Sequence, residues 1–196
     1  KRRPWSIVLV PTRELANQVA DELAPLAEAR GLWITAIYGG VSMSRQINAL
    51  RAGVDIVIAT PGRMNDLLER DEMSVADVRF VVLDEADQMA DMGFLPQVER
   101  ILKQISGKPQ TLLFSATLDG AVGQLVQRHG FSDILYMGLG SVPNAFGIAY
   151  DDYLALAHAQ RVDPDVVHCS PDFFRIMWSL YLDKLLSHPD EVARIY

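Results

Sequence analysis

The chain has 196 residues and a net charge of −7, with 49% hydrophobic and 22% charged residues. This composition is typical of a soluble globular protein and excludes a disordered one, and the length allows one domain with a full core but not two. The negative charge excludes a global basic field that would draw the protein onto nucleic acid, so any polyanion site must be local.

Apolar runs and cysteine content bear on the cellular setting. No apolar run reaches the roughly 18 to 20 residues of a membrane helix, and the N-terminal stretch lacks the core of a signal peptide. Cys169 is the single cysteine, which rules out an internal disulfide framework and is typical of a reducing compartment. We therefore expect a cytoplasmic protein without membrane association.

Up to Arg128, short β-branched runs alternate with amphipathic stretches, the pattern of repeated β-α units in a parallel sheet. The predicted strands are Ile7–Val10, Trp33–Tyr38, Ile56–Ala59, Phe80–Leu83 and Thr111–Phe114. The predicted helices lie between the strands, in residues 13–31, 42–53, 62–71 and 91–106. Pro25 is expected to kink or split the first of these helices. Such units build a three-layer α/β sandwich, in which ligands collect at the C-terminal ends of the strands.

The pattern changes near residue 130. Residues 130–148 are rich in glycine and contain a Pro-Asn turn, so we interpret them as a strand-like piece followed by a linker. Residues 149–196 are interpreted as a mostly helical segment of unknown role, with Ser170 and Pro171 starting its longer helix. The expected organisation is therefore a domain in residues 1–129, a linker in 130–148 and a helical segment in 149–196.

A short motif follows each predicted strand. The motifs are Pro11-Thr12-Arg13-Glu14-Leu15-Ala16, Gly39-Gly40, Thr60-Pro61-Gly62-Arg63, Asp84-Glu85-Ala86-Asp87 and Ser115-Ala116-Thr117. Helix N-termini and glycine turns at this edge of the sheet point N–H groups outward, which suits phosphate binding. Arg13 and Arg63 add guanidinium groups that fork onto phosphate oxygens, so the edge suits a nucleic-acid backbone bound with little base recognition. The acidic motif suits Mg²⁺ on a nucleoside triphosphate.

In this order, the strings "PTRELA", "GG", "TPGR", "DEAD" and "SAT" resemble the first RecA-like domain of the DEAD-box RNA helicase family, over roughly residues 5–128. Five such strings in family order, each at a strand end, make an accidental match negligible. The resemblance implies an α/β fold with a mostly parallel RecA-like sheet of the P-loop NTPase type. It also implies an ATP-dependent RNA helicase, which couples ATP hydrolysis to the unwinding or remodelling of RNA duplexes.

The resemblance further implies a role for each motif residue. Asp84 would hold Mg²⁺, through water, and Glu85 would position the water that attacks the γ-phosphate. Asp87 would connect the nucleotide to the coupling residues Ser115, Ala116 and Thr117. The residues expected to contact or shape the RNA backbone are Pro11, Thr12, Arg13, Glu14, Gly39, Gly40, Thr60, Pro61, Gly62 and Arg63. The implied cofactors are ATP and Mg²⁺, and the implied partner is RNA, bound independently of sequence.

One part of the expected nucleotide site is missing from the sequence. The 196 residues contain no G-x-x-x-x-G-K-[ST] string, the loop that cradles nucleotide phosphates. In the family this loop precedes "PTRELA" and a second RecA-like domain follows, so the sheet is expected to be incomplete at its N-terminus. Another chain or domain would supply both parts, and Ile134–Met137 would fill the place of the missing strand. The alternative function is a truncated or rearranged, catalytically inactive fragment that binds RNA or protein.

Each candidate residue also has a purely structural interpretation. The acids could form a solvated turn, Arg13 and Arg63 could make salt bridges or pack within the domain, and Gly39-Gly40 could be a simple turn. The four histidines lack metal-ligand spacing and Cys169 lacks catalytic partners, so these residues are expected to be structural. An aromatic group is expected to pack in a core or against a partner: Phe173, Phe174, Trp178 and Tyr181.

Overall fold

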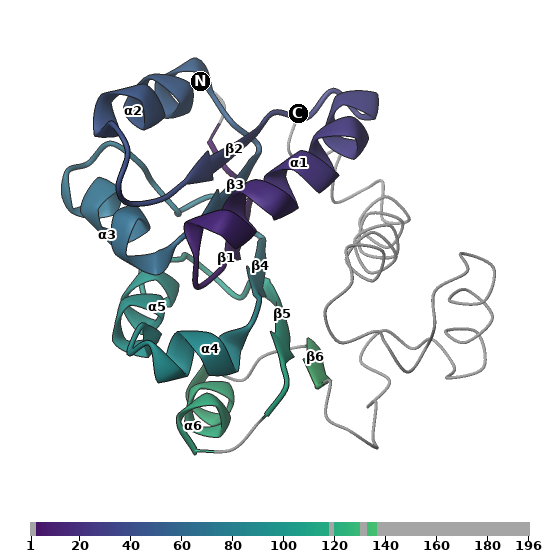
Figure 1. The fold of residues 1–196 in the computed structure, drawn as a ribbon, viewed down its shortest axis with the longest axis vertical. Helices are drawn as coiled ribbons and strands as arrows, with labels where there is room; N and C mark the ends of the chain where they lie inside the picture. The colour runs from purple at the N-terminus through teal and green to yellow at the C-terminus, as the bar shows by residue number, and fades with distance from the viewer. Residues whose placement is uncertain (1–2, 118–119, 130–132, 137–196) are drawn as a thin grey trace. The chain divides into compact units, whose positions relative to one another are not determined.

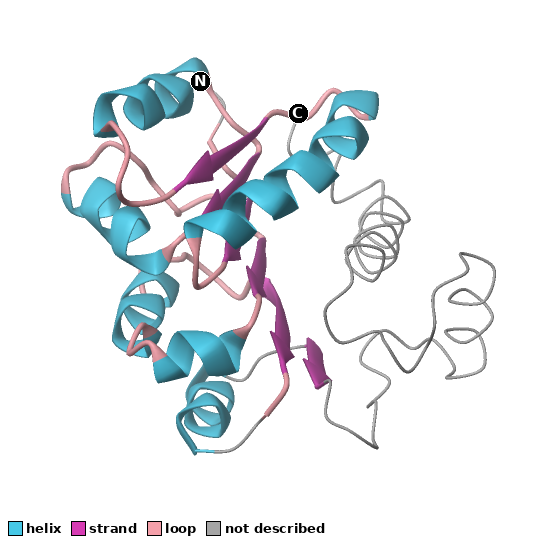
Figure 2. Cartoon of the chain, in the orientation of Figure 1, coloured by secondary structure: helices cyan, strands magenta, loops and turns pink. Residues whose placement is uncertain are grey.

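In the computed structural model, which describes residues 3–117, 120–129 and 133–136, six strands form one parallel sheet (Figure 1). The strand order across the sheet is β2-β3-β1-β4-β5-β6. The strands are β1 Ser6–Leu9, β2 Ile34–Ile37, β3 Ile56–Ala59, β4 Phe80–Leu83, β5 Gln110–Ser115 and β6 Asp133–Tyr136. The helices are α1 Arg13–Ala29, α2 Met43–Ala52, α3 Pro61–Glu69, α4 Ala86–Asp91, α5 Leu95–Leu102 and α6 Gly120–His129 (Figure 2).

The central strands have continuously apolar sequences. β1, β3 and β4 read SIVL, IVIA and FVVL, and every residue in these three strands is buried. A parallel strand with helices packed on both sides of the sheet is buried on both of its own faces, so the usual alternation with polar residues disappears. β2 lies at an edge of the sheet and is less buried.

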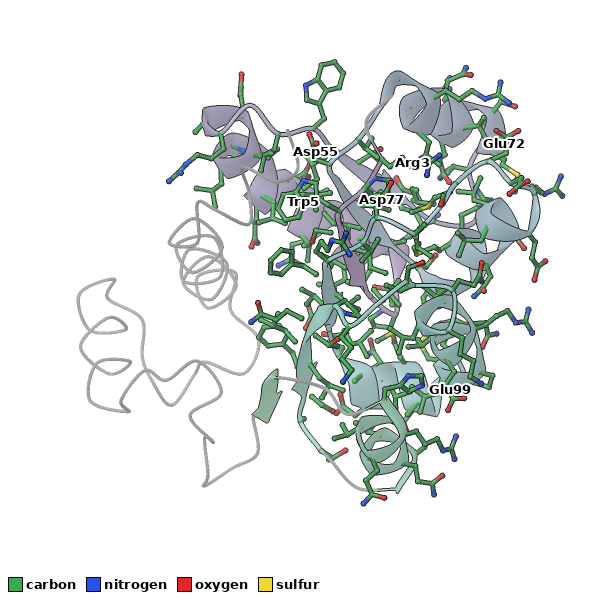
Figure 3. All side chains as sticks on the ribbon, turned by 180° about the vertical axis from the view of Figure 1, so that it is seen from behind. Arg3, Trp5, Asp55, Glu72, Asp77 and Glu99 are labelled. Carbon is green, nitrogen blue, oxygen red and sulfur yellow. The ribbon has the colours of Figure 1, made fainter. Side chains whose placement is uncertain are left out.

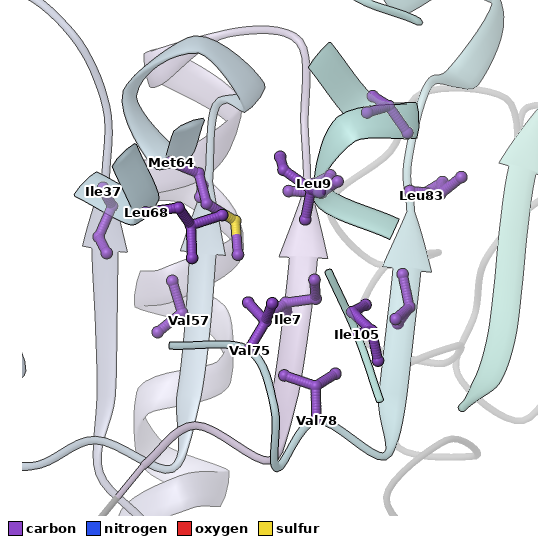
Figure 4. Packing of buried hydrophobic residues seen from close by; sticks show 14 of the residues in the cluster. Ile7, Leu9, Ile37, Val57, Met64, Leu68, Val75, Val78, Leu83 and Ile105 are labelled. Atoms are coloured by element: carbon purple, nitrogen blue, oxygen red, sulfur yellow. The ribbon is translucent and has the colours of Figure 1, made fainter. Parts of the chain in front are cut away.

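The larger core lies on one face of the sheet, between the strands and α2–α6 (Figure 4). Ile7 and Leu9 of β1, Val57 of β3 and Leu83 of β4 point into this core. Each of the five helices contributes buried side chains to the same cluster, among them Leu50, Met64, Met89, Val98 and Val122. These contacts hold the helix starts, and the loops before them, close to the ends of the strands.

Helix α1 covers the opposite face, where it contacts β2 and β3 (Figure 1). Its buried residues recur at helical spacing: Leu15, Ala16, Val19, Leu23 and Ala27. The strand residues that alternate with those of the larger core, such as Val8 and Ile58, are also fully buried. The fold is therefore the three-layer α/β sandwich that the sequence predicts.

Asp55 organises the edge of the sheet where the strands begin. Its carboxylate Oδ2 accepts the backbone N–H of Trp33 at 2.7 Å, although the residue is only 4% exposed. Its backbone carbonyl accepts the N–H groups of Trp5 at 3.1 Å and Ser6 at 3.2 Å. Trp5 and Asp55 are accordingly neighbours in Figure 3. These bonds align the starts of β1, β2 and β3, so the three strands also end together.

All five predicted strands are present, and β3 and β4 have the predicted bounds. The helix predicted over residues 91–106 is present as α5, but it begins later than predicted because the segment breaks at Gly93, and α4 before the break was not predicted. The Gly93 N–H donates to the carbonyl of Ala90 at 3.0 Å, and the Phe94 N–H donates to that of Met89 at 2.8 Å. With φ of 74° at Gly93, this is the hydrogen-bond pattern that ends a helix, so α4 and α5 are separate.

Of the two effects predicted for Pro25, the split is wrong, because α1 runs without interruption from Arg13 to Ala29, and the kink stays a prediction. Proline lacks the N–H that would bond to the carbonyl of Asp21. Both Pro25 and Asp21 are exposed, so water can satisfy that carbonyl and the helix continues.

Strand β6 confirms that residues after 130 add a strand to the sheet. It pairs in parallel with β5, from Leu112 opposite Asp133 to Ser115 opposite Tyr136. The hypothesis that Ile134–Met137 takes the place of a strand missing from the family's sheet stays a hypothesis. Residues 137–196 lie outside the described residues, and with them the rest of the predicted linker, the predicted helical segment, Cys169, the aromatic group and three of the four histidines.

Candidate functional site

The five motifs meet at one edge of the sheet because the strands before them are parallel and in register. Leu9 of β1 lies opposite Ala59 of β3 and Leu83 of β4, and Leu83 lies opposite Leu113 of β5. Ile37, at the end of β2, lies opposite Ala59 as well. The residues that follow β1, β2, β3 and β4 therefore leave the sheet side by side, whereas β5 continues for two more residues, to Ser115, before its motif leaves the sheet.

Backbone hydrogen bonds continue past the strand ends and hold the first motif residues in place. The Thr60 N–H donates to the carbonyl of Ile37 at 2.9 Å, and the Asp84 N–H donates to that of Leu9 at 2.9 Å. Each bond joins the start of one motif to the strand beside it. The first residues of these two motifs are therefore tied to the neighbouring strands.

Asp84 is a buried acid with an unpaired oxygen. It is 4% exposed, its Oδ1 accepts the Glu85 N–H at 3.0 Å, and its Oδ2 is buried without a hydrogen-bond partner. Burial, followed by the negative charge of Glu85 and with a smaller effect of Asp87, raises the pKa of Asp84 from its ordinary value of 3.8 to about 8. A buried carboxylate oxygen without a donor is unfavourable unless a cation neutralises it. Asp84 therefore fits a Mg²⁺ ligand.

Glu85 adopts the left-handed backbone conformation, with φ of 49° and ψ of 51°. For a residue other than glycine this conformation costs about 1–2 kcal/mol. Its side chain is half-buried, and burial, followed by the negative charge of Asp87, raises the pKa of Glu85. The strained turn separates Glu85 from the buried Asp84 and leaves its carboxylate partly open to solvent.

The expected link from Asp87 to the third motif stays a prediction. In the described part of the chain, Asp87 makes no hydrogen bond to Ser115 or Thr117, although α4 packs against β5. The Ser115 hydroxyl instead donates to the carbonyl of Thr117 at 2.6 Å and accepts the Thr117 N–H at 3.4 Å. Ser115 is buried, whereas Ala116 and Thr117 are exposed. The motif thus forms a local turn that presents its last two residues to solvent.

The first motif starts helix α1. Thr12 is its N-terminal cap, and the Thr12 side chain accepts the Leu15 N–H at 3.2 Å, while Pro11 before it is buried. Arg13 and Glu14 are exposed, and Arg13 Nε lies 2.6 Å from Glu14 Oε1. This hydrogen bond lowers the pKa of Glu14. The arginine is therefore held at the surface by its neighbour.

Arg13 also reaches the glycine pair after β2. A Cβ built on Gly40 would lie 3.9 Å from Arg13 Nη1, so the first two motifs are adjacent. Gly40 has φ of 79°, a conformation that L side chains rarely adopt. Gly39 and Gly40 are exposed, and a Cβ on Gly39 would meet nothing within 4 Å. The pair is a turn with its backbone open to a ligand.

The motif after β3 starts helix α3, with Pro61 in the first turn and Thr60 as the capping residue. Unlike Thr12, Thr60 makes no capping hydrogen bond through its side chain, so its hydroxyl remains available to a ligand. Pro61 is buried, and Thr60, Gly62 and Arg63 are partly exposed. The motif therefore combines a structural proline with three residues near the surface.

The guanidinium of Arg63 is bonded inside the domain. Its Nη1 donates to Gln46 Oε1 at 3.0 Å and to the carbonyl of Val41 at 3.3 Å, and its Nη2 donates to the same carbonyl at 3.4 Å. Gln46 in turn donates from Nε2 to the carbonyl of Tyr38 at 2.9 Å. Of the structural alternatives for Arg63, packing within the domain is therefore present.

Gln46 is the site residue that sequence reasoning missed. It lies on α2 four residues before Leu50, and these two are the buried residues of that helix. A glutamine at a core-facing position was the available signal, because a buried amide needs hydrogen-bond partners. Periodicity alone could not show that the partners come from β2 and α3.

Two further observations limit what the site can be. Within residues 3–117, 120–129 and 133–136, no three His, Cys, Asp or Glu side chains are grouped so as to hold a metal ion by themselves. A Mg²⁺ bound with a nucleotide takes most of its ligands from phosphate and water, so one or two carboxylates suffice. None of the helices in this part of the chain is both long and apolar enough to cross a bilayer.

The chain is similar to known helicases in sequence. The model of the DEAD/DEAH box helicase family matches residues 1–125. A protein of Oryza sativa subsp. japonica named DEAD-box ATP-dependent RNA helicase 5 is 54% identical over 124 residues, which are 63% of this chain and 24% of that protein. The chain spans about a quarter of the length of the curated relatives it matches.

Solved structures show the same likeness in fold. A hypothetical ATP-dependent RNA helicase from Sulfolobus tokodaii is 36% identical with a TM-score of 0.63, over 67% of this chain and 40% of that one. The yeast DEAD-box splicing factor Prp28 is 33% identical with a TM-score of 0.62, over 65% and 31%. The sheet and its helices are thus the RecA-like fold of these proteins. Together with a family match over more than half of its length, this shows that the chain belongs to the DEAD/DEAH box helicase family.

Proposed function

We propose that this chain is part of an ATP-dependent RNA helicase, in which it binds the RNA backbone and the Mg²⁺ of ATP at one edge of its sheet. The observation that carries the proposal is the buried, unpaired Oδ2 of Asp84, in register with the arginine and glycine motifs. The curated relatives named above are ATP-dependent RNA helicases, which supports the same assignment. The cytoplasmic setting expected from the cysteine content stays a prediction.

In the nucleotide half of the site, Asp84 would hold Mg²⁺, directly or through water. Mg²⁺, when bound with ATP, neutralises charge on the β- and γ-phosphates. Glu85 is half-buried and its pKa is raised, so it suits a residue that orients the attacking water and accepts its proton. Asp87, in the first turn of α4, would couple this step to Ser115, Ala116 and Thr117.

In the RNA half of the site, phosphates would lie along the exposed N-termini of α1 and α3 and the glycine turn between β2 and α2. Backbone N–H groups at helix starts and the guanidinium of Arg13 are the donors that phosphate oxygens prefer. Thr60 adds a hydroxyl that capping leaves available. Contacts of this kind position a strand without reading its bases, so binding should be independent of sequence.

The alternative is an inactive fragment that binds RNA or protein without hydrolysing ATP. The 196 residues contain no G-x-x-x-x-G-K-[ST] string. Under the first proposal, another chain or domain supplies that loop and the second RecA-like domain. The two proposals share the RNA contacts and differ in the use of Glu85.

Binding of polyuridine RNA, measured by fluorescence anisotropy, tests the shared part. Arg13→Ala should weaken binding several-fold. It should also reduce the slope of log Kd against log salt concentration by the equivalent of about one phosphate contact. Arg30→Ala is the matched control, since Arg30 is exposed at the opposite end of the same helix. If the unaltered chain does not bind RNA, or if both variants weaken binding equally, the assignment of this edge is wrong.

Phosphate release in the presence of RNA separates the two proposals. Hydrolysis that disappears in Glu85→Gln supports the helicase. RNA binding without hydrolysis, even after addition of polypeptide from a relative that carries both the phosphate loop and the second domain, supports the inactive fragment. Hydrolysis that persists in Glu85→Gln contradicts the role given to this residue.

A further inference from the structure

Gln46 joins two of the motif loops through its side-chain amide. One end of the amide donates to the carbonyl of Tyr38, where β2 ends, and the other end accepts from Arg63 on α3. Arg63 then returns to the same loop through the carbonyl of Val41. These hydrogen bonds form a closed set around the Gly39-Gly40 turn, which we call the bracket: Tyr38, Val41, Gln46 and Arg63. Tyr38 and Val41 lie at the two ends of the turn.

The bracket matters because packing does not hold the turn. A Cβ on Gly39 would meet nothing within 4 Å, and a Cβ on Gly40 would meet only Arg13 Nη1, at 3.9 Å. Gly39, Gly40 and Val41 are exposed, with Val41 43% exposed. A glycine pair without packing contacts has many accessible backbone conformations. The hydrogen bonds to Tyr38 and Val41 are therefore the contacts that confine the turn.

Burial of Gln46 and of the inner part of Arg63 also fixes the bracket. Gln46 is 7% exposed and lies near the start of α2, so its side chain is covered from a ligand at the surface. Arg63 Nε is buried and has no hydrogen-bond partner. The inner part of the Arg63 side chain is therefore enclosed by the protein, and the hydrogen-bonded Nη atoms form its outer end. Any other rotamer of Gln46 would leave a buried amide unpaired, which is unfavourable.

We propose that Gln46 is a positioning residue, which locks the Gly39–Val41 turn to the N-terminus of α3 so that the two phosphate-binding motifs act as one rigid surface. The inference rests on the RNA binding proposed above. Gln46 does not touch RNA. It acts through Arg63, which it orients, and through the glycine turn, whose N–H groups it holds in place.

The variant Gln46→Leu removes both hydrogen bonds while keeping a side chain of similar size. It should weaken polyuridine binding by about fivefold to fiftyfold, the equivalent of one or two hydrogen bonds between partly buried groups. In an Arg63→Ala background the same change should have a clearly smaller effect than in the unaltered chain, because only the bond to the carbonyl of Tyr38 remains to be lost. Asn48→Leu, on the exposed side of the same helix, is the matched control and should leave binding unchanged.

Gln46→Glu separates the two arms of the bracket. A carboxylate still accepts from Arg63 but has no donor for the carbonyl of Tyr38. This variant should therefore give an intermediate loss of affinity. It also serves if Gln46→Leu does not fold, since it preserves the polar contact with Arg63.

A second measurement does not depend on RNA. Backbone order parameters of Gly40 and Val41, measured by NMR on the free chain, should fall from roughly 0.85 to below about 0.6 in Gln46→Leu, while those of β1 and β4 stay unchanged. If the unaltered chain does not bind RNA, the proposed function fails, but this measurement still tests the bracket. Unchanged order in the turn, or losses of affinity that simply add to those of Arg63→Ala, would overturn the inference.

Discussion

The backbone N–H of Glu85 donates to Asp84 Oδ1 at 3.0 Å, while the other carboxylate oxygen, Asp84 Oδ2, is buried and has no donor. Glu85 itself adopts the left-handed conformation, which turns the chain sharply at the end of β4. The acid pair is the centre of the proposed nucleotide site, and both members have consequences for stability.

Stability should depend on pH through Asp84. In the folded chain burial raises the pKa of Asp84 to about 8, above its ordinary value of 3.8, so the folded state favours the protonated acid. The stability that this proton contributes is complete below about pH 4 and is lost progressively as the pH rises toward 8.

Asp84→Asn removes this titration. The difference in free energy of unfolding between the variant and the unaltered chain, measured by urea denaturation without Mg²⁺, should shift in favour of the variant between pH 4 and pH 8. The shift should exceed about 1 kcal/mol, the equivalent of one pKa unit. Asp91→Asn, an exposed acid on α4, should show no such trend. A constant difference across this range would mean that Asp84 is ionised without penalty.

The strain at Glu85 should appear as a difference between two amide variants. Asparagine tolerates the left-handed conformation better than glutamine, because its short side chain bonds to the local backbone. Glu85→Asn should therefore be more stable than Glu85→Gln by roughly 0.5–1 kcal/mol, with both lacking hydrolysis. Urea denaturation of the two purified proteins measures the difference. Equal stabilities would show that the turn is not strained in solution.

Two threonines in equivalent positions should respond differently to the same substitution. Thr12→Ala removes the hydrogen bond to the Leu15 N–H and should lower the free energy of unfolding by about 1 kcal/mol. Thr60→Ala removes no such bond and should change stability little. Both variants should weaken RNA binding if both threonines face the backbone. A large loss of stability in Thr60→Ala would contradict the cap assignments.

The two glycines of the turn also form a matched pair. Gly40→Ala places a side chain on a residue with φ of 79° and should lower stability by about 1 kcal/mol or more. The loss comes from backbone strain, since the new Cβ would make only ordinary contact with Arg13. Gly39→Ala meets open space and should be tolerated. Thermal unfolding of the two variants, compared side by side, tests this difference.

The sequence predicts the fold well because the strands are buried and β-branched. β3 and β4 are recovered residue for residue, since IVIA and FVVL are bounded by turn residues and motif residues. The division of residues 91–106 is missed because it depends on the left-handed conformation of Gly93, which apolar periodicity does not reveal. Hydrophobic periodicity therefore predicts which segments form helices and strands, whereas a single glycine can decide where a helix ends.

The candidate site is predicted less completely. The motifs lie at one edge of the sheet, because parallel strands in register require it. That Arg63 binds phosphate stays a prediction, and the sequence does not reveal that its guanidinium is bonded to Gln46 and Val41. Such bonds join residues 17 to 22 positions apart on different elements, and no local pattern records them.

The most direct test of the proposed site is calorimetric titration of the chain with ATP in the presence of Mg²⁺. We expect binding that Asp84→Asn abolishes and that Asp91→Asn leaves intact, because Asp84 offers a buried oxygen to the cation and Asp91 is exposed. Binding that is unaffected by Asp84→Asn, or no binding even at millimolar ATP by a chain shown to be folded, would contradict a nucleotide site at this edge of the sheet.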